Sequence, residues 1–381
     1  MSEAPLIYYL ESKFTGDNNN CLAVAQNVHP QAKVAPVSEK MLLRYSGCGE
    51  LSENGFAQEI LTNPKPDIFL FSGSRDGLMS EFCRPISEAG ICMVGMRSPD
   101  QTGGLYYADS RVDVTLSYSH AGSFDELVCH GREMTDFQKE WALFFDHCPT
   151  PITVEGLVEA RREIPEEIAE IAATPGPTVV AALGSFINFV QDIPTAKETE
   201  VSAQLLEQTL THIAESVKAI DGSLLLTTSR RTANGNTDLI RDLVADIPAY
   251  VHDFSVEGPN PYRPMLSVAD RVVVTGDSIS MTSDALVTGK PVFVSLPTDY
   301  DADLTGLGLP KSNPLFGKHM RYGLRVAVKN YMDGLFKREE AHPISALATP
   351  NLPNRQPINS APAMGAAVHA AWQDWKHQRS A

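Results

Sequence analysis

The sequence predicts an α/β protein built from two doubly wound, parallel sheets. Short apolar runs alternate along the chain with segments of helical pattern, and continuous apolar runs are typical of strands buried on both faces. The chain has 381 residues, which is enough for two domains of this kind. Apolar residues make up 43% of it, as in an ordinary globular protein.

Five apolar, β-rich runs fall in each half of the chain. In the first half they cover residues 5–10, 32–37, 67–73, 91–96 and 112–118. In the second half they cover residues 178–184, 223–229, 249–254, 271–276 and 291–296. One sheet of ten strands is conceivable, but two sheets of about five strands suit this length better.

The domain boundary is predicted at "ATPGPT" (173–178), where Pro and Gly end a helical segment before a new strand. This gives an N-terminal domain of residues 1–172 and a C-terminal domain of residues 173–345. The Pro-rich stretch 342–364 is expected to be extended. The segment "GAAVHAAWQDWKHQ" after it predicts a terminal helix with tryptophan anchors, and residues 362–381 are assigned to the first domain.

The charge and cysteine pattern exclude several classes of protein. A net charge of −16 argues against nucleic-acid binding, which needs a basic face. The six cysteines form no C-x-x-C motif, and Cys129-His130 and His147-Cys148 are better explained as buried thiols beside incidental histidines.

No apolar run suits a signal peptide or a spanning helix, so a cytoplasmic protein is expected, with attachment to the inner face of the membrane left open.

The polar residues that follow the second-half strands are the strongest sign of a ligand. Ligands of open parallel sheets sit beyond the carboxyl ends of the strands. Gly184 and Ser185 follow one strand there, residues 229–232 follow the next, and residues 277–280 follow a third. Because Gly184 and Ser185 are small, a planar part of a ligand could approach the backbone there. Arg230 and Arg231 would pair with phosphate oxygens of the ligand.

A helix is predicted to begin shortly after residue 276. Ser278 or Ser280 would cap this helix, and the positive end of its dipole favours a phosphate. Asp284, one turn further, could accept hydrogen bonds from a ribose. Each feature also has an ordinary explanation: hydroxyls before a helix are normal caps, paired arginines are common on surfaces, and "GPNPY" (258–262) is a turn. Their convergence on one sheet edge favours a ligand site.

Three segments resemble one known family. "TTSRRT" (227–232), "GPNPY" and "VADRVVVTGDSISMTSDALVTGKPVFV" (268–294) are similar to bacterial relatives of the plant mitochondrial-fission factor family, often labelled nucleoside-diphosphate-sugar epimerases. The last segment also resembles the donor site of the glycosyltransferases that build the lipid-linked disaccharide of peptidoglycan, although Asp284 stands where both groups have Glu.

The resemblance implies a type-B glycosyltransferase fold, with two Rossmann-like domains facing a cleft and a last helix crossing back to the first domain. It also implies a metal-independent donor site for a nucleotide-diphosphate sugar in the second domain, with no cofactor. The donor site is predicted to comprise Gly184, Ser185, Ser229, Arg230, Arg231, Thr232, Asn260, Tyr262, Asp277, Ser278, Ser280, Met281 and Asp284.

The first half is expected to carry the acceptor side. Loops after the early strands offer three polar or charged candidates, Lys13, Arg75 and Asp100. An inverting transfer needs one general base, and Asp17 and His120 are the candidates, each of which could instead be a turn former or a surface histidine. Asp17 lies in "GDNNN" (16–20), whose composition predicts a loop.

Three functions are compatible with these features. The first is a glycosyltransferase that transfers a sugar from a nucleotide-diphosphate sugar to a cell-envelope or polysaccharide-type acceptor, which could be a glycan or be lipid-linked. The second is a non-catalytic scaffold of the same fold that recruits a protein partner. The third is a nucleotide-sugar epimerase. The absence of G-x-G-x-x-G after the first strand argues against an NAD-dependent epimerase.

Overall fold

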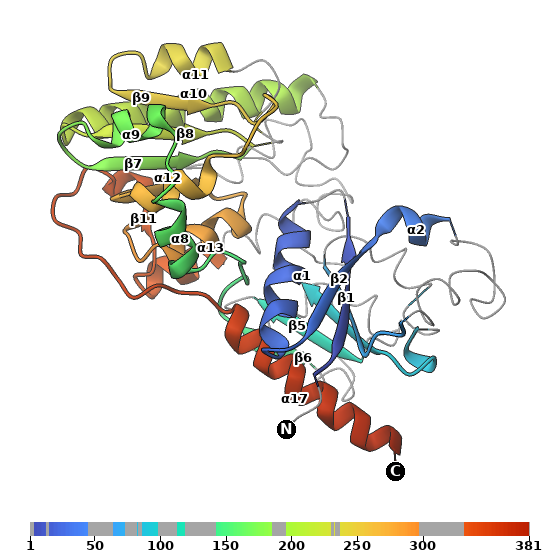
Figure 1. Cartoon of the computed structure of the whole chain (residues 1–381). Coiled ribbons are helices and arrows are strands. Elements are labelled where there is room, and N and C mark those ends of the chain that lie inside the picture. Colours follow the sequence, from blue (N-terminus) through green and yellow to red (C-terminus); the bar gives the residue numbers. More distant parts are fainter. Residues whose placement is uncertain are drawn as a thin grey trace, which may run out of the picture. The chain divides into compact units, whose positions relative to one another are not determined.

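A computed structural model describes residues 4–12, 15–44, 64–72, 82, 86–97, 113–118, 142–184, 196–229, 232, 237–296 and 331–380 (Figure 1). The chain divides into two compact units. The first comprises Met1–Pro151 and Asn359–Ala381, and the second comprises Ile152–Ile358.

The first unit contains a six-stranded parallel sheet with strand order β2-β1-β3-β4-β5-β6. The strands are β1 (Leu6–Glu11), β2 (Lys33–Ser38), β3 (Ile68–Ser72), β4 (Cys92–Arg97), β5 (Val114–Tyr118) and β6 (Ala142–Phe145). The helices described in this unit are α1 (Thr15–Val28), α2 (Glu39–Leu43) and the terminal α17 (Ala361–Ser380). Strand β3 is buried along its whole length, whereas the edge strand β2 is largely open to solvent.

The terminal helix α17 packs against α1 and also contacts β4 and β5 (Figure 1). Asn359 accepts a hydrogen bond from the Ala361 N–H at the start of this helix. Gly365 lies so close to α1 that an added methyl group would overlap the backbone of Asn27. Trp372 is 1% exposed, so the last helix completes the core of the first unit, as predicted.

The second unit contains a six-stranded parallel sheet with strand order β12-β11-β10-β7-β8-β9. The strands are β7 (Thr178–Ala182), β8 (Ser223–Thr227), β9 (Ala249–His252), β10 (Arg271–Thr275), β11 (Val292–Ser295) and β12 (His342–Pro343). The helices described are α8 (Val154–Ala160), α9 (Glu166–Ala172), α10 (Ala196–Ala219), α11 (Thr237–Leu243), α12 (Tyr262–Val268) and α13 (Ile279–Val287), with the short 3₁₀ helix η1 (Ile344–Ala346). The central strands β7, β8 and β10 are buried at every position, which matches their continuous apolar sequences.

Residues 152–172 lie in the second unit, although the sequence analysis assigned them to the first domain. Pro165 separates α8 from α9, because proline cannot continue a helix interior. Helix α9 contacts β8 and β9, and α8 packs against α12. Helix α9 therefore covers part of the second sheet, and α8 belongs to the same unit through its contact with α12.

Candidate functional site

The carboxyl ends of β7, β8 and β10, which are neighbours in the second sheet, are joined by hydrogen bonds. The Gly184 N–H donates to the Thr275 hydroxyl at 2.7 Å. The Thr232 hydroxyl donates to the Leu183 carbonyl at 2.7 Å and accepts from the Ser229 N–H at 2.8 Å. The segments after these strands therefore meet at one edge of the sheet. We refer to Gly184, Ser229, Thr232, Thr275, Asp277 and Ser278 as the strand-end cluster.

Asp277 lies directly against Gly184. A methyl group added at Gly184 would overlap both carboxylate oxygens of Asp277, so the absence of a side chain at position 184 makes room for this carboxylate. Asp277 is 9% exposed, and Thr275 is fully buried. The cluster thus combines buried hydroxyls with a buried carboxylate, and both kinds of group form hydrogen bonds with polar ligands.

Helix α13 begins directly after Asp277. Ser278 occupies the N-cap position, as predicted, but its side chain makes no capping hydrogen bond. The Thr282 hydroxyl instead donates to the Ser278 carbonyl at 2.8 Å. Ser280 and Met281 lie in the first turn and are half-buried. The positive end of the α13 dipole is therefore located at the strand-end cluster.

Asp284 and Tyr262 form a second part of the site, between α13 and α12. The Tyr262 hydroxyl is buried, and burial is the main reason why the pKa of Tyr262 lies well above its ordinary value. The neighbouring Asp284 carboxylate raises this pKa further. Asn260 is exposed, and its side-chain oxygen accepts a hydrogen bond from the Tyr262 N–H at 3.0 Å. The local role of Asn260 is therefore to close the turn that begins α12.

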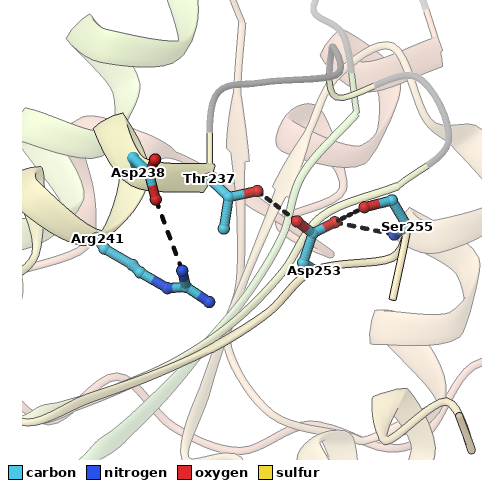
Figure 2. A network of polar contacts seen from close by, with 5 residues as sticks. All are labelled: Thr237, Asp238, Arg241, Asp253 and Ser255. Carbon is cyan, nitrogen blue, oxygen red and sulfur yellow. Dashed lines mark hydrogen bonds and ion pairs between the residues drawn. The ribbon is translucent and has the colours of Figure 1, made fainter. Parts of the chain in front are cut away.

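The loop after β9 is held by Asp253, a residue that the sequence analysis did not select (Figure 2). Its carboxylate accepts from the Thr237 hydroxyl at 2.5 Å, and from the N–H and hydroxyl of Ser255 at 2.9 and 2.7 Å. These bonds hold the pKa of Asp253 below its ordinary value. The spacing Asp-x-Ser is a turn signal that could have indicated this loop. The nearby ion pair of Arg241 with Asp238, at 3.7 Å, is exposed and contributes little.

The first unit places Asp17 in the first turn of α1, close to the end of β3. The Ser72 hydroxyl donates to the Asp17 carboxylate at 3.5 Å. The prediction of a loop over residues 16–20 was wrong, because these residues lie within α1. The Asn18 side chain explains this difference: it accepts from the Ser12 N–H and donates to the Ser12 carbonyl, both at 2.8 Å, and so fixes the entry into the helix.

Several predicted site residues lie outside the described residues: Lys13, Arg75, Asp100, His120, Ser185, Arg230 and Arg231. Cys129 and His130 also lie outside them. The buried Cys148 thiol donates to the Asn20 side-chain oxygen at 3.4 Å. Within the described part of the chain, no group of three or more His, Cys, Asp or Glu side chains could hold a metal ion.

The two parallel doubly wound units, with the terminal helix returned to the first, define a fold of the type-B glycosyltransferase kind. A family model described as mitochondrial fission ELM1 matches residues 15–302, and the chain belongs to this family. The mitochondrial fission protein ELM1 of Arabidopsis thaliana is 35% identical over 125 residues, which cover 33% of this chain and 27% of the plant protein. The match thus spans about a quarter of the plant protein's length.

Solved structures with a similar chain path include a glycosyltransferase from Rickettsia africae ESF-5. It is 10% identical to this chain with a TM-score of 0.47, and the match covers 92% of this chain and 100% of the glycosyltransferase. A UDP-GlcNAc 2-epimerase from Neisseria meningitidis, bound to UDP-GlcNAc, has 13% identity, a TM-score of 0.49 and coverage of 97% and 99%. At such low identities and scores, these similarities carry no information about chemistry. Among the described residues, no helix has the length and apolar character needed to cross a membrane.

Proposed function

We propose that this protein binds a nucleotide-diphosphate sugar at the strand-end cluster and transfers the sugar to an acceptor. The observation that carries the proposal is the hydrogen-bonded meeting of the ends of β7, β8 and β10 next to the start of α13. In an open parallel sheet this edge is where ligands bind, and a helix N-terminus there favours phosphate. The similarity of residues 268–294 to glycosyltransferase donor sites supports the same assignment.

The diphosphate would lie at the start of α13, near Ser278 and Ser280, with Arg230 and Arg231 as further phosphate partners. The ribose would lie near Asp284, one turn along the same helix. Stabilising the diphosphate leaving group requires positive charge or helix N-termini in this position. In the first unit, Asp17 is the candidate for the general base that deprotonates the acceptor hydroxyl, with His120 as the alternative. The acceptor would be a glycan or a lipid-linked molecule that binds the first unit, with Lys13, Arg75 and Asp100 as its expected contacts.

Calorimetric titration of the folded protein with UDP-, GDP- and CMP-sugars tests the donor site directly. We expect one of them to bind, and we expect binding to weaken when Ser278 and Asp284 are replaced by alanine. Transfer is then tested by mass spectrometry of the sugar released or attached in the presence of candidate acceptors. If none of the nucleotide sugars binds to folded protein, the proposed donor site is wrong.

The family supports a second candidate function. The plant relative is a mitochondrial fission protein, and its name states no sugar-transfer activity. A scaffold of this fold that recruits a protein partner would need no ligand at the strand-end cluster. In that case, replacing Ser278 would leave the cellular phenotype intact, whereas substitutions of exposed residues such as Val256 would abolish it.

A further inference from the structure

The Tyr262 hydroxyl is a buried polar group next to the residue that the proposed function assigns to the ribose. It is closed to solvent, and the carboxylate of Asp284 is its neighbouring acceptor. Among the described residues, no group completes a hydrogen bond of full geometry with this hydroxyl. Buried hydroxyls nearly always have a complete hydrogen bond, so an incomplete one calls for an explanation.

The two side chains differ in their access to a ligand. Asp284 is half-buried, so part of this residue is open to the surface of the second unit. The Tyr262 hydroxyl has no such opening. A ribose at this position would therefore contact Asp284 directly, whereas Tyr262 would act on the ribose only through the carboxylate.

One carboxylate has enough acceptor capacity for both partners. An ionised carboxylate only accepts hydrogen bonds, and its two oxygens offer about four acceptor positions. The diol of a ribose brings two donors, which leaves room for the phenol of Tyr262. Burial is the main reason why the pKa of Tyr262 lies well above its ordinary value of 10.0, so the phenol remains a donor at neutral pH.

Tyr262 is itself held firmly in place. It is the first residue of α12 and follows Pro261, whose ring restricts the backbone. The Tyr262 N–H donates to the Asn260 side-chain oxygen at 3.0 Å, and the Met265 N–H donates to the Pro261 carbonyl at 2.9 Å. Helix α12 packs in turn against β7, α8 and α9. The phenol is therefore a fixed donor beside the Asp284 carboxylate.

Building on the proposed function, we propose that Tyr262 is a positioning residue that orients Asp284 for the two hydroxyls of a ribose. When the carboxylate accepts hydrogen bonds from the diol, it also completes its hydrogen bond with the buried phenol. Each contact then favours the other, because both require the same orientation of the carboxylate. The site is thereby selective for ribonucleotides over ligands that lack the diol.

The test measures selectivity for the diol as well as affinity. UDP, GDP and their 2′,3′-dideoxy forms are titrated calorimetrically into the wild-type protein and the Tyr262→Phe variant. For the wild-type protein, we expect the ribonucleotide to bind about tenfold or more tightly, because the dideoxy form lacks the hydrogen bonds to a charged group. For Tyr262→Phe, this ratio should fall by about threefold or more. A purely structural tyrosine would change both affinities alike and leave the ratio unchanged.

Two further variants locate the effect. Tyr250→Phe removes a half-buried hydroxyl from the edge strand β9, which is separated from β10 by β7 and β8, and should keep the wild-type ratio. Asp284→Ala should abolish the selectivity, and adding Tyr262→Phe to it should have no further effect on the ratio. Thermal melting verifies that each protein is folded.

The results that overturn the inference are distinguishable from one another. Equal wild-type affinity for ribonucleotide and dideoxy form would show that Asp284 does not bind the diol. An unchanged ratio in Tyr262→Phe would show that the tyrosine does not position Asp284, while the proposed donor site would stand. A selectivity that survives in Asp284→Ala and is lost on adding Tyr262→Phe would mean that the tyrosine contacts the ribose itself. If neither ribonucleotide binds to any of the folded proteins, the proposed function fails, and this inference fails with it.

Discussion

The buried hydroxyl of Tyr262 lies against the carboxylate of Asp284, and this pair joins the start of α12 to the second turn of α13. Burial and the adjacent negative charge raise the pKa of Tyr262 well above its ordinary value of 10.0. Asp284 therefore has two candidate roles: a structural contact with Tyr262 within the protein, and binding of the ribose of a ligand. The two roles predict different effects of replacing Asp284.

If Asp284 binds the ribose, Asp284→Ala should weaken nucleoside-diphosphate binding about tenfold, because a hydrogen bond to a charged group is lost. Asp246→Ala removes an exposed carboxylate in the turn before β9 and serves as the control, so its affinity should stay close to that of the wild-type protein. Calorimetric titration measures the affinity and urea unfolding measures the stability. If Asp284→Ala lowers the stability but leaves the affinity unchanged, its role is structural only.

Gly184→Ala should destabilise the second unit by about 1–3 kcal/mol, because the added methyl group would overlap the Asp277 carboxylate and overpack a filled site. The double variant Gly184→Ala/Asp277→Ser should recover part of this loss, since serine is shorter. Urea unfolding of the four proteins gives a double-mutant cycle, and we expect a coupling of at least about 0.5 kcal/mol. Additive effects would show that the two side chains do not compete for space.

The sheets could be predicted from the sequence because burial on both faces leaves a continuous apolar pattern. Runs such as "RVVVT" and "SLLLT" are buried at every position, and all ten predicted strands occur in the two sheets. Two strands were missed. The apolar run of β6 (Ala142–Phe145) could have been recognised. The short β12 consists of His342 and Pro343 and carries no apolar pattern, and proline is confined to sheet edges.

The position of the candidate site was also predictable, but its internal contacts were not. The carboxyl ends of parallel strands share one edge, so the order of the strands brings Gly184 and Thr275 together. The contact of Asp277 with Gly184 depends instead on side-chain packing between two loops. Residues 16–20 were misread because Asn and Asp favour turns, whereas here Asn18 anchors a helix that packs against the distant α17.

His369 should make the first unit less stable in mild acid. Its ring stacks on His29 with centroids 5.4 Å apart and meets the edge of Trp372, while Lys376 lies over the Trp372 ring. Its Nδ1 is buried and has no hydrogen-bond partner among the described residues. Burial lowers the pKa of His369 from its ordinary value of 6.5, and the electrostatic effect of the neighbouring His29 lowers it further.

A lowered pKa means that the unfolded chain binds the proton more tightly than the folded protein does. The resulting stability is fully present above pH of about 6.5 and is lost as the pH falls toward the lowered pKa of the folded state. His369→Gln should therefore flatten the fall in melting temperature between neutral and mildly acidic pH. His377→Gln, on the exposed side of the same helix, is the control and should keep the wild-type profile. Identical profiles for His369→Gln and the wild-type protein would contradict this assignment.

Gly365 provides the clearest test of how α17 is seated, because two effects of its replacement have opposite signs. In an exposed helix, alanine is more favourable than glycine by about 1 kcal/mol, so Gly365→Ala would stabilise α17 if the helix were free. At the contact with α1, the added methyl group would overlap the backbone of Asn27, which cannot move aside as a flexible side chain would. We therefore expect Gly365→Ala to lower the free energy of unfolding by about 1–3 kcal/mol. Ala366→Gly, at an exposed position of the same helix, reports the helix propensity alone. A stabilised Gly365→Ala protein would mean that α17 does not pack closely on α1, and that the terminal helix does not complete the first unit.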